Sequence, residues 1–215
     1  MRFINIMLTL ALALALGACG GKGPTKKERI DAFNETGWEL FQKGDFTAAL
    51  EEFSEALALD STNVAANVGL GWCMLLLGDP NLSAIIAALE VGATSASWQH
   101  DAWCGLAVAN LNQQLYAEAD SVAGLVLAAD SSYVFTYRPQ IDWQDLLVIQ
   151  AQARFFTTAY IQAWQAIQPL IVGPPYDAID PADPTTWVIG TTSYSLFEEV
   201  LAVIISALAE QYRQM

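Results

Sequence analysis

Apolar side chains recur every three or four positions along most of the chain, and this spacing predicts amphipathic helices. The pattern is clearest over residues 46–57, where the apolar positions are Phe46, Ala49, Leu50, Phe53, Ala56 and Leu57. A second helical pattern precedes this one, and the two meet at Lys43-Gly44-Asp45. Gly44 can end the first helix and Asp45 can cap the second, so the stretch predicts a helical hairpin.

The same pattern returns 34 residues further along the chain. The matching positions are Gly37 with Gly71, Trp38 with Trp72, and Gly44-Asp45 with Gly78-Asp79. Pro80 then stands at the first position of the next predicted helix, where its missing N–H costs nothing. A third unit follows over about 100–133, offset by 36 residues because its preceding loop is longer. A fixed period of this length predicts a repeat architecture.

These units resemble the tetratricopeptide repeat, a pair of antiparallel helices about 34 residues long. The first unit carries the most matching positions: Phe33, Gly37, Leu40, Gly44, Asp45, Phe46, Ala49, Phe53 and Ala56. The third unit has Gln114 where the turn glycine belongs. The resemblance implies an all-α fold, a right-handed α-solenoid of three or four helical hairpins. The hairpins are expected at about 30–63, 64–97, 100–133 and 141–172.

The fourth hairpin is displaced by an insertion over residues 131–140, which explains the 44-residue step from Tyr116 to Tyr160. Residues 173–193 are rich in proline and aspartate, so we expect a long irregular loop there. A last helix is expected over residues 194–213. It is apolar around nearly its whole circumference and should therefore be buried, capping the solenoid.

The resemblance also implies a concave groove lined by the first helix of each hairpin. The groove positions are Asn34, Trp38, Phe41, Val68, Trp72, Leu75, Val108, Leu111 and Asn112. An apolar trough headed by two tryptophans suits an apolar helix or an extended peptide of a partner protein. The chain's own C-terminal helix is also long enough to fill this trough. An external partner and self-packing therefore remain open alternatives.

The N-terminus has the pattern of a secretory signal over residues 1–18. The apolar run 3–16 is too short to span a bilayer and ends in Leu16-Gly17-Ala18-Cys19, which resembles the lipobox of bacterial lipoproteins. The resemblance implies that Cys19 is lipidated with three acyl chains and that residues 19–27 form a tether. Gly20, rather than Asp, favours the outer membrane, facing the periplasm. The alternative is an ordinary cleaved signal with an incidental cysteine.

Charge and composition narrow the function further. The chain has 23 acidic and 9 basic residues, a net charge of −14, which argues against a nucleic-acid partner. One histidine and three cysteines provide almost no material for a metal site, and we expect no cofactor. Cys73 and Cys104 are interpreted as buried free thiols, with a disulfide as the alternative.

No catalytic signature occurs: the chain lacks a phosphate-binding glycine loop, an HExxH pair and a nucleophile elbow. His100 is interpreted as an ordinary surface or cap residue, and the acidic pairs Asp142/Asp145 and Glu198/Glu199 as helix-start residues. We therefore expect a membrane-anchored, non-enzymatic scaffold for a protein partner, with a role in envelope assembly or secretion. The alternative is a glycan- or peptide-binding lipoprotein whose aromatic platform would comprise Trp98, Trp143, Trp164 and Trp187.

Overall fold

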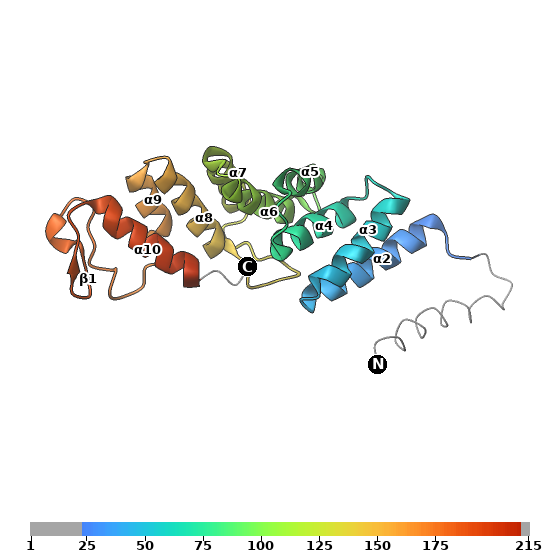
Figure 1. The fold of residues 1–215 in the computed structure, drawn as a ribbon, viewed down its shortest axis with the longest axis horizontal. Coiled ribbons are helices and arrows are strands. Elements are labelled where there is room, and N and C mark those ends of the chain that lie inside the picture. Colours follow the sequence, from blue (N-terminus) through green and yellow to red (C-terminus); the bar gives the residue numbers. More distant parts are fainter. Residues whose placement is uncertain (1–22, 212–215) are drawn as a thin grey trace.

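A computed structural model describes residues 23–211 and confirms the all-α solenoid. Helices follow one another in antiparallel pairs, and the pairs stack side by side into an elongated row (Figure 1). The first helices of successive pairs also contact one another, so they line the inner face of the row. The hairpins are α2 (Lys26–Gln42) with α3 (Phe46–Leu59), α4 (Val64–Leu77) with α5 (Leu82–Ala93), α6 (Gln99–Asn112) with α7 (Tyr116–Ala129), and α8 (Trp143–Phe156) with α9 (Tyr160–Ile167).

All four hairpins turn through the same backbone conformation, although only two of them have a glycine there. Gly44 and Gly78 have φ values of 81° and 69°, while Gln114 and Thr158 both have φ 63°. A left-handed conformation at a residue with a Cβ costs about 1 kcal/mol or more. Each turn is closed by the same N–H to C=O hydrogen bond, from Asp45 to Leu40, Asp79 to Met74, Leu115 to Asn110 and Ala159 to Arg154. These bonds place the four hairpins in one common register.

Side-chain caps start most of the helices. Thr25 and Glu28 form a capping box at the start of α2, and Asp142 and Asp145 form another at the start of α8. The start of α5 differs from the sequence prediction, because Asn81 is the N-cap and Pro80 lies outside the helix rather than at its first position. The Asn81 side chain accepts a hydrogen bond from the Ala84 N–H at 3.2 Å, which gives the helix a polar cap that Pro80 could not supply.

Close helix packing in the first two hairpins depends on glycine. The ring of Phe53 on α3 lies against Gly37 of α2 and Gly69 of α4. A Cβ atom at these two positions would stand 2.7 Å and 2.3 Å from ring carbons of Phe53, closer than van der Waals contact allows. The repeat therefore brings three backbones around one fully buried aromatic side chain.

The α8 helix divides the core into two clusters. Leu146 and Ile149 on one face belong to the larger cluster with α2–α7, whereas Val148 and Ala151 face α9 and α10. The C-terminal helix α10 (Phe197–Gln211) packs against α8 and α9 and so covers the end of the row (Figure 1). It begins at Phe197 rather than Tyr194, with Glu199 accepting hydrogen bonds from the N–H groups of Ser195 and Leu196.

The segment before α10 is more ordered than the irregular loop expected from its prolines. Within it lies the short 3-10 helix η3 (Pro184–Thr186), and another, η2 (Gln168–Leu170), comes before it, directly after α9. It also contains a small antiparallel hairpin of β1 (Val188–Ile189) and β2 (Thr192–Ser193), with Gly190 at φ 61° in the turn. None of the helices within residues 23–211 is long and apolar enough to cross a membrane.

Candidate functional site

The predicted groove residues lie on the first helices of the first three hairpins. Asn34, Trp38 and Phe41 are on α2, Val68, Trp72 and Leu75 are on α4, and Val108, Leu111 and Asn112 are at or near the end of α6. The helix positions therefore follow the repeat register. These residues do not line an open trough, because most of those on α2 and α4 are buried.

A segment between α7 and α8, residues 131–140, lies over the inner face of the first two hairpins and is named here the inner segment. Phe135 stacks on Trp72 with 4.9 Å between ring centroids, and Tyr137 stacks on Trp38 at 4.1 Å. Trp98, from the start of the third hairpin, stacks on the Trp38 ring at 5.0 Å. The two tryptophans expected to head an open trough are thus covered by the chain itself.

The burial of the groove residues reflects this covering. Four of the nine are at most 5% exposed: Trp38, Phe41, Val68 and Trp72. Asn34, Leu75, Val108 and Leu111 are half-buried, and Asn112 is exposed. In this arrangement a partner can reach the α6 end of the predicted groove, but not the tryptophans.

Self-packing by the C-terminal helix, the alternative considered from the sequence, is wrong. The α10 helix lies on α8 and α9, and its buried side chains belong to the other core cluster. A signal for the inner segment was present in the sequence: Tyr133, Phe135 and Tyr137 alternate with polar or exposed residues. A period of two indicates an extended segment with one apolar face.

Hydrogen bonds hold the inner segment in place. At its base, the Phe135 N–H donates to the Ile141 carbonyl at 2.9 Å and the Trp143 N–H donates to the Tyr133 carbonyl at 2.8 Å. The Tyr133 hydroxyl donates to Asp101 Oδ1 at 2.9 Å, and Trp72 Nε1 donates to the Asp101 carbonyl at 3.0 Å. Asp101 on α6 thereby ties the segment and α4 together.

The titratable groups beneath the inner segment are shifted mainly by loss of water. Burial raises the pKa of Asp101, although the hydrogen bond from Tyr133 opposes this shift. Burial also raises the pKa of the Cys73 thiol to about 12 and that of Cys104 further still. Both cysteines are buried free thiols, as predicted, and their shifts keep them protonated at neutral pH.

Asp145 is the most deeply buried carboxyl group among the described residues, at 1% exposure. Its Oδ2 accepts a hydrogen bond from the Asp142 N–H at 2.9 Å, whereas its buried Oδ1 has no hydrogen-bond partner. Loss of water raises its pKa to about 7, and the charge of Asp142 acts in the same direction. The capping role predicted for this acidic pair is present, with an electrostatic cost that the pattern did not indicate.

The four tryptophans considered for a glycan platform do not come together. Trp98 packs with Trp38 in the larger core cluster, whereas Trp143, Trp164 and Trp187 belong to the cluster around α10. His100 lies beside Trp103, with 5.9 Å between ring centroids. Within residues 23–211 no three His, Cys, Asp or Glu side chains are grouped so that they could hold a metal ion. Cys19, the predicted lipidation site, lies outside the described residues.

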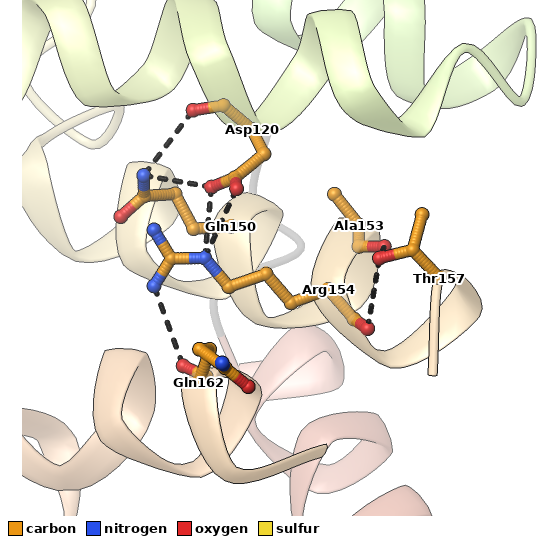
Figure 2. A network of polar contacts seen from close by, with 6 residues as sticks. All are labelled: Asp120, Gln150, Ala153, Arg154, Thr157 and Gln162. Atoms are coloured by element: carbon orange, nitrogen blue, oxygen red, sulfur yellow. Dashed lines mark hydrogen bonds and ion pairs between the residues drawn. The ribbon is translucent and has the colours of Figure 1, made fainter. Parts of the chain in front are cut away.

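A polar network that the sequence did not reveal joins the third and fourth hairpins (Figure 2). Arg154 on α8 donates from Nε to the Asp120 carboxylate on α7, at 2.9 Å and 3.1 Å to its two oxygens. The same guanidinium donates to the Gln162 carbonyl on α9 at 3.3 Å. Gln150 donates its amide to Asp120 Oδ1 at 2.9 Å. One arginine side chain therefore occupies the junction of three helices.

Comparison with known proteins agrees with the repeat geometry. Residues 40–86 match the tetratricopeptide repeat family. This range runs from the end of α2 into α5 and contains the join between the first two hairpins. A comparison with curated proteins finds no match. The family match supports a tetratricopeptide-repeat protein, a class whose repeats generally provide scaffolds for protein contacts rather than catalysts.

Proposed function

We propose that this protein is a scaffold for protein–protein contacts that is held on a membrane surface by lipid at Cys19. The observation that carries the scaffold role is the row of stacked helical hairpins together with the repeat match over residues 40–86. The anchor rests on the sequence Leu16-Gly17-Ala18-Cys19 directly after an apolar run. A solenoid of hairpins offers a long surface in proportion to its mass, which suits binding more than chemistry.

The start of the solenoid is compatible with a membrane surface close by. The α2 helix begins at Lys26, seven residues after Cys19, so the tether between lipid and fold is short. Lys26, Lys27 and Arg29 are exposed in the first turns of this helix. Each basic side chain near an anionic lipid surface contributes about 1 kcal/mol of attraction. The rest of the body is acidic and would be repelled from that surface, which leaves it free for partners.

The proposed location is the outer membrane, facing the periplasm, because Gly20 rather than Asp follows the lipidated cysteine. A partner there would belong to the cell envelope, as in assembly or secretion. The partner surface cannot be the tryptophan trough as long as the inner segment covers it. It must use the α6 end of the groove or the outer surfaces of the hairpins.

The anchor is tested with Cys19→Ser in the full chain expressed in bacteria. Burying each CH₂ contributes about 0.8 kcal/mol, so removal of all acyl chains should release the protein from membranes. We expect the variant in the soluble fraction and without incorporation of an alkyne-labelled palmitate. Thr25→Ser, which keeps the helix cap, is the matched control and should remain labelled and membrane-bound. Retention of Cys19→Ser on washed membranes contradicts the anchor.

The location is tested separately with Gly20→Asp. If the outer membrane is correct, this variant should move to the inner-membrane fraction on a sucrose gradient while keeping its lipid label. An unchanged distribution of Gly20→Asp and wild type would contradict the assignment to the outer membrane. The lipid label distinguishes a sorting defect from a loss of the anchor.

A further inference from the structure

The helices α5 and α7, the second helices of hairpins two and three, lie on either side of α6 (Figure 1). A groove lies between α5 and α7 and is lined by residues of all three helices. Its volume is about 690 Å³. Ile86, Leu106 and Val122 supply apolar walls, while Glu90 and Glu118 are exposed acids at its sides. No Lys, Arg or His is among the described residues that line it. It is named here the outer groove.

An unpaired amide lies in the outer groove. Asn110 on α6 lines it and is only 7% exposed. Its side chain forms no hydrogen bond with any residue of the described chain, whereas its backbone carbonyl accepts from Leu115 in the turn. Its amide atoms are not among the fully enclosed side-chain atoms that lack a partner, so they are open to the groove and can be satisfied by water or a ligand there. Asn110 is therefore placed to bind something that enters the groove.

The equivalent place one hairpin later, where α7, α8 and α9 meet, is filled by an arginine side chain. Asn110 and Arg154 stand at the same place in α6 and α8, because each precedes by four residues a turn residue with φ 63°, Gln114 and Thr158 respectively. Arg154 extends into the junction of α7, α8 and α9 (Figure 2). In the junction of α5, α6 and α7, the shorter Asn110 leaves space instead.

The two junctions also differ in charge. Around Arg154, the Asp120 carboxylate balances the guanidinium within the chain. Around Asn110, the carboxylates of Glu90 and Glu118 are present, and no cation from residues 23–211 lines the groove. Glu118 stands at the position in α7 that Gln162 has in α9, and there the backbone carbonyl of Gln162 accepts from Arg154. The outer groove is lined by two carboxylates and, among the described residues, by no guanidinium.

We propose that the outer groove binds an arginine side chain carried on an apolar segment of a partner protein. The guanidinium would lie between Glu90, Glu118 and the Asn110 amide oxygen, with apolar neighbours against Ile86 and Val122. Arginine fits better than lysine because its planar group offers five donors and is more weakly hydrated. This proposal rests on the proposed function in one respect, that the protein binds other proteins. It does not depend on the lipid anchor.

A second copy of this chain is a poor occupant. With a net charge of −14, two copies repel each other, and the outer groove adds two further carboxylates at the contact. Of the three arginines in residues 23–211, Arg154 is held by Asp120, and Arg138 lies over the Phe46 ring at 5.2 Å. Arg29 is exposed, but it stands among charged residues at the start of α2 rather than on an apolar segment. Self-association through the outer groove would therefore contradict the proposal.

The test uses the full chain in detergent and a fluorescein-labelled peptide, Gly-Leu-Arg-Leu-Gly, with binding followed by anisotropy. We expect the peptide to bind, and its citrulline counterpart, which keeps the shape but loses the charge, to bind about tenfold more weakly. Asn110→Arg places a guanidinium in the groove from within, as Arg154 does one junction later. This variant should fold with an unchanged or higher melting temperature. Its affinity for the peptide should fall about tenfold or more.

Gln165→Arg is the matched control, because it adds the same charge at an exposed position of α9 away from the groove. It should bind like wild type. Glu118→Gln changes an exposed acid and should weaken binding of the peptide. This variant tests the proposal even if Asn110→Arg fails to fold. Equal binding of the arginine and citrulline peptides, no binding at the highest soluble concentration, or equal losses in Gln165→Arg would each overturn the proposal. The proposal would also be overturned if the wild-type protein formed a dimer and Asn110→Arg abolished it. None of these results bears on membrane release by Cys19→Ser, so the two proposals fail separately.

Discussion

Asp145 illustrates how one residue can serve a helix start and still weaken the fold. Its side chain completes the capping box of α8, which satisfies the Asp142 N–H that the helix leaves without a partner. The same position removes the carboxyl group from water and leaves Oδ1 without a hydrogen bond. The cap therefore uses the carboxyl group as a hydrogen-bond acceptor, while burial favours the protonated form of the same group.

The pH dependence of stability should carry the signature of this carboxyl group. Its pKa rises from 3.8 to about 7 in the folded protein, so the folded state holds the proton more tightly than the unfolded state. The stabilisation is complete below about pH 4 and is lost as the pH rises through 7, by an amount of roughly 4 kcal/mol. We expect the melting temperature to fall over this range, and to fall less in Asp145→Asn, whose amide oxygen can still accept from Asp142.

Asp177→Asn, at an exposed position of the loop before α10, is the control and should reproduce the wild-type pH profile. Some slope should persist in Asp145→Asn because the pKa of Asp101 is raised as well. Cys104 also lies within electrostatic range of Asp145, but its raised pKa keeps it neutral over this pH range. A profile of Asp145→Asn that coincides with wild type would show that Asp145 does not titrate as described.

Among the elements, the inner segment has the largest effect on which surfaces remain available. It consists of turns with one β-bridge, between Val134 and Asp142, and it covers the side of the solenoid where the repeat pattern predicts a binding trough. The Arg138 guanidinium lies over the Phe46 ring, so the segment reaches as far as the start of α3. The insertion thus supplies from within the chain the aromatic contacts that a partner peptide would otherwise make.

Removing the central ring of the inner segment should uncover the trough. Phe135 is fully buried and contacts Trp38, Phe41 and Trp72, so Phe135→Ala should lower the free energy of unfolding by about 3 to 5 kcal/mol. Tryptophan fluorescence of the folded variant should shift to longer wavelength as water reaches the two indole rings. Val134→Ala is the matched control, because Val134 is 47% exposed on the other side of the same segment. Unchanged fluorescence in Phe135→Ala would mean that the trough stays closed without this ring.

The helices could be predicted from the sequence and the covering of the groove could not, for a physical reason. Helix periodicity and Gly44-Asp45 turn chemistry are local, so they can be read from a window of a few residues. The pairing of Phe135 with Trp72 joins residues 63 positions apart and depends on the final stacking of three hairpins. The left-handed conformations of Gln114 and Thr158 could not be predicted for a related reason, since packing of the repeat imposes there a conformation that the local residue does not favour.

The site residues divide in the same way. The repeat register placed Trp38 and Trp72 on the correct helices, but their exposure depends on what packs over them. The outer groove escaped notice because it results from a short side chain at Asn110 where the next repeat has an arginine. The 44-residue step between the last two hairpins already aligns Asn110 with Arg154, but the space beside Asn110 depends on how α5, α6 and α7 pack.

On the scale of the whole molecule, the solenoid behaves as a chain of neighbours. Each helix contacts the helices next to it in sequence, and α8 is the element shared by the two core clusters. Stability in such an array is approximately the sum of each repeat and its interfaces. The end of the row is the exception, because α9 is short and has only α8 and α10 as large neighbouring helices. The α10 helix therefore covers the apolar surface that α8 and α9 leave at this end of the row.

Charging the buried face of α10 should consequently unfold one end of the molecule and spare the other. Leu201 is fully buried against the second core cluster, so Leu201→Asp buries an unpaired carboxylate at a cost of roughly 4 kcal/mol or more. Hydrogen exchange followed by mass spectrometry should show lost protection in α9 and α10, with the amides of α2–α5 protected as in wild type. Val203→Asp, at a position 36% exposed on the same helix, should leave the protection of both ends unchanged. Uniform loss of protection along the chain in Leu201→Asp would instead mean that the two clusters unfold as one cooperative unit, and α8 would then transmit the loss rather than confine it.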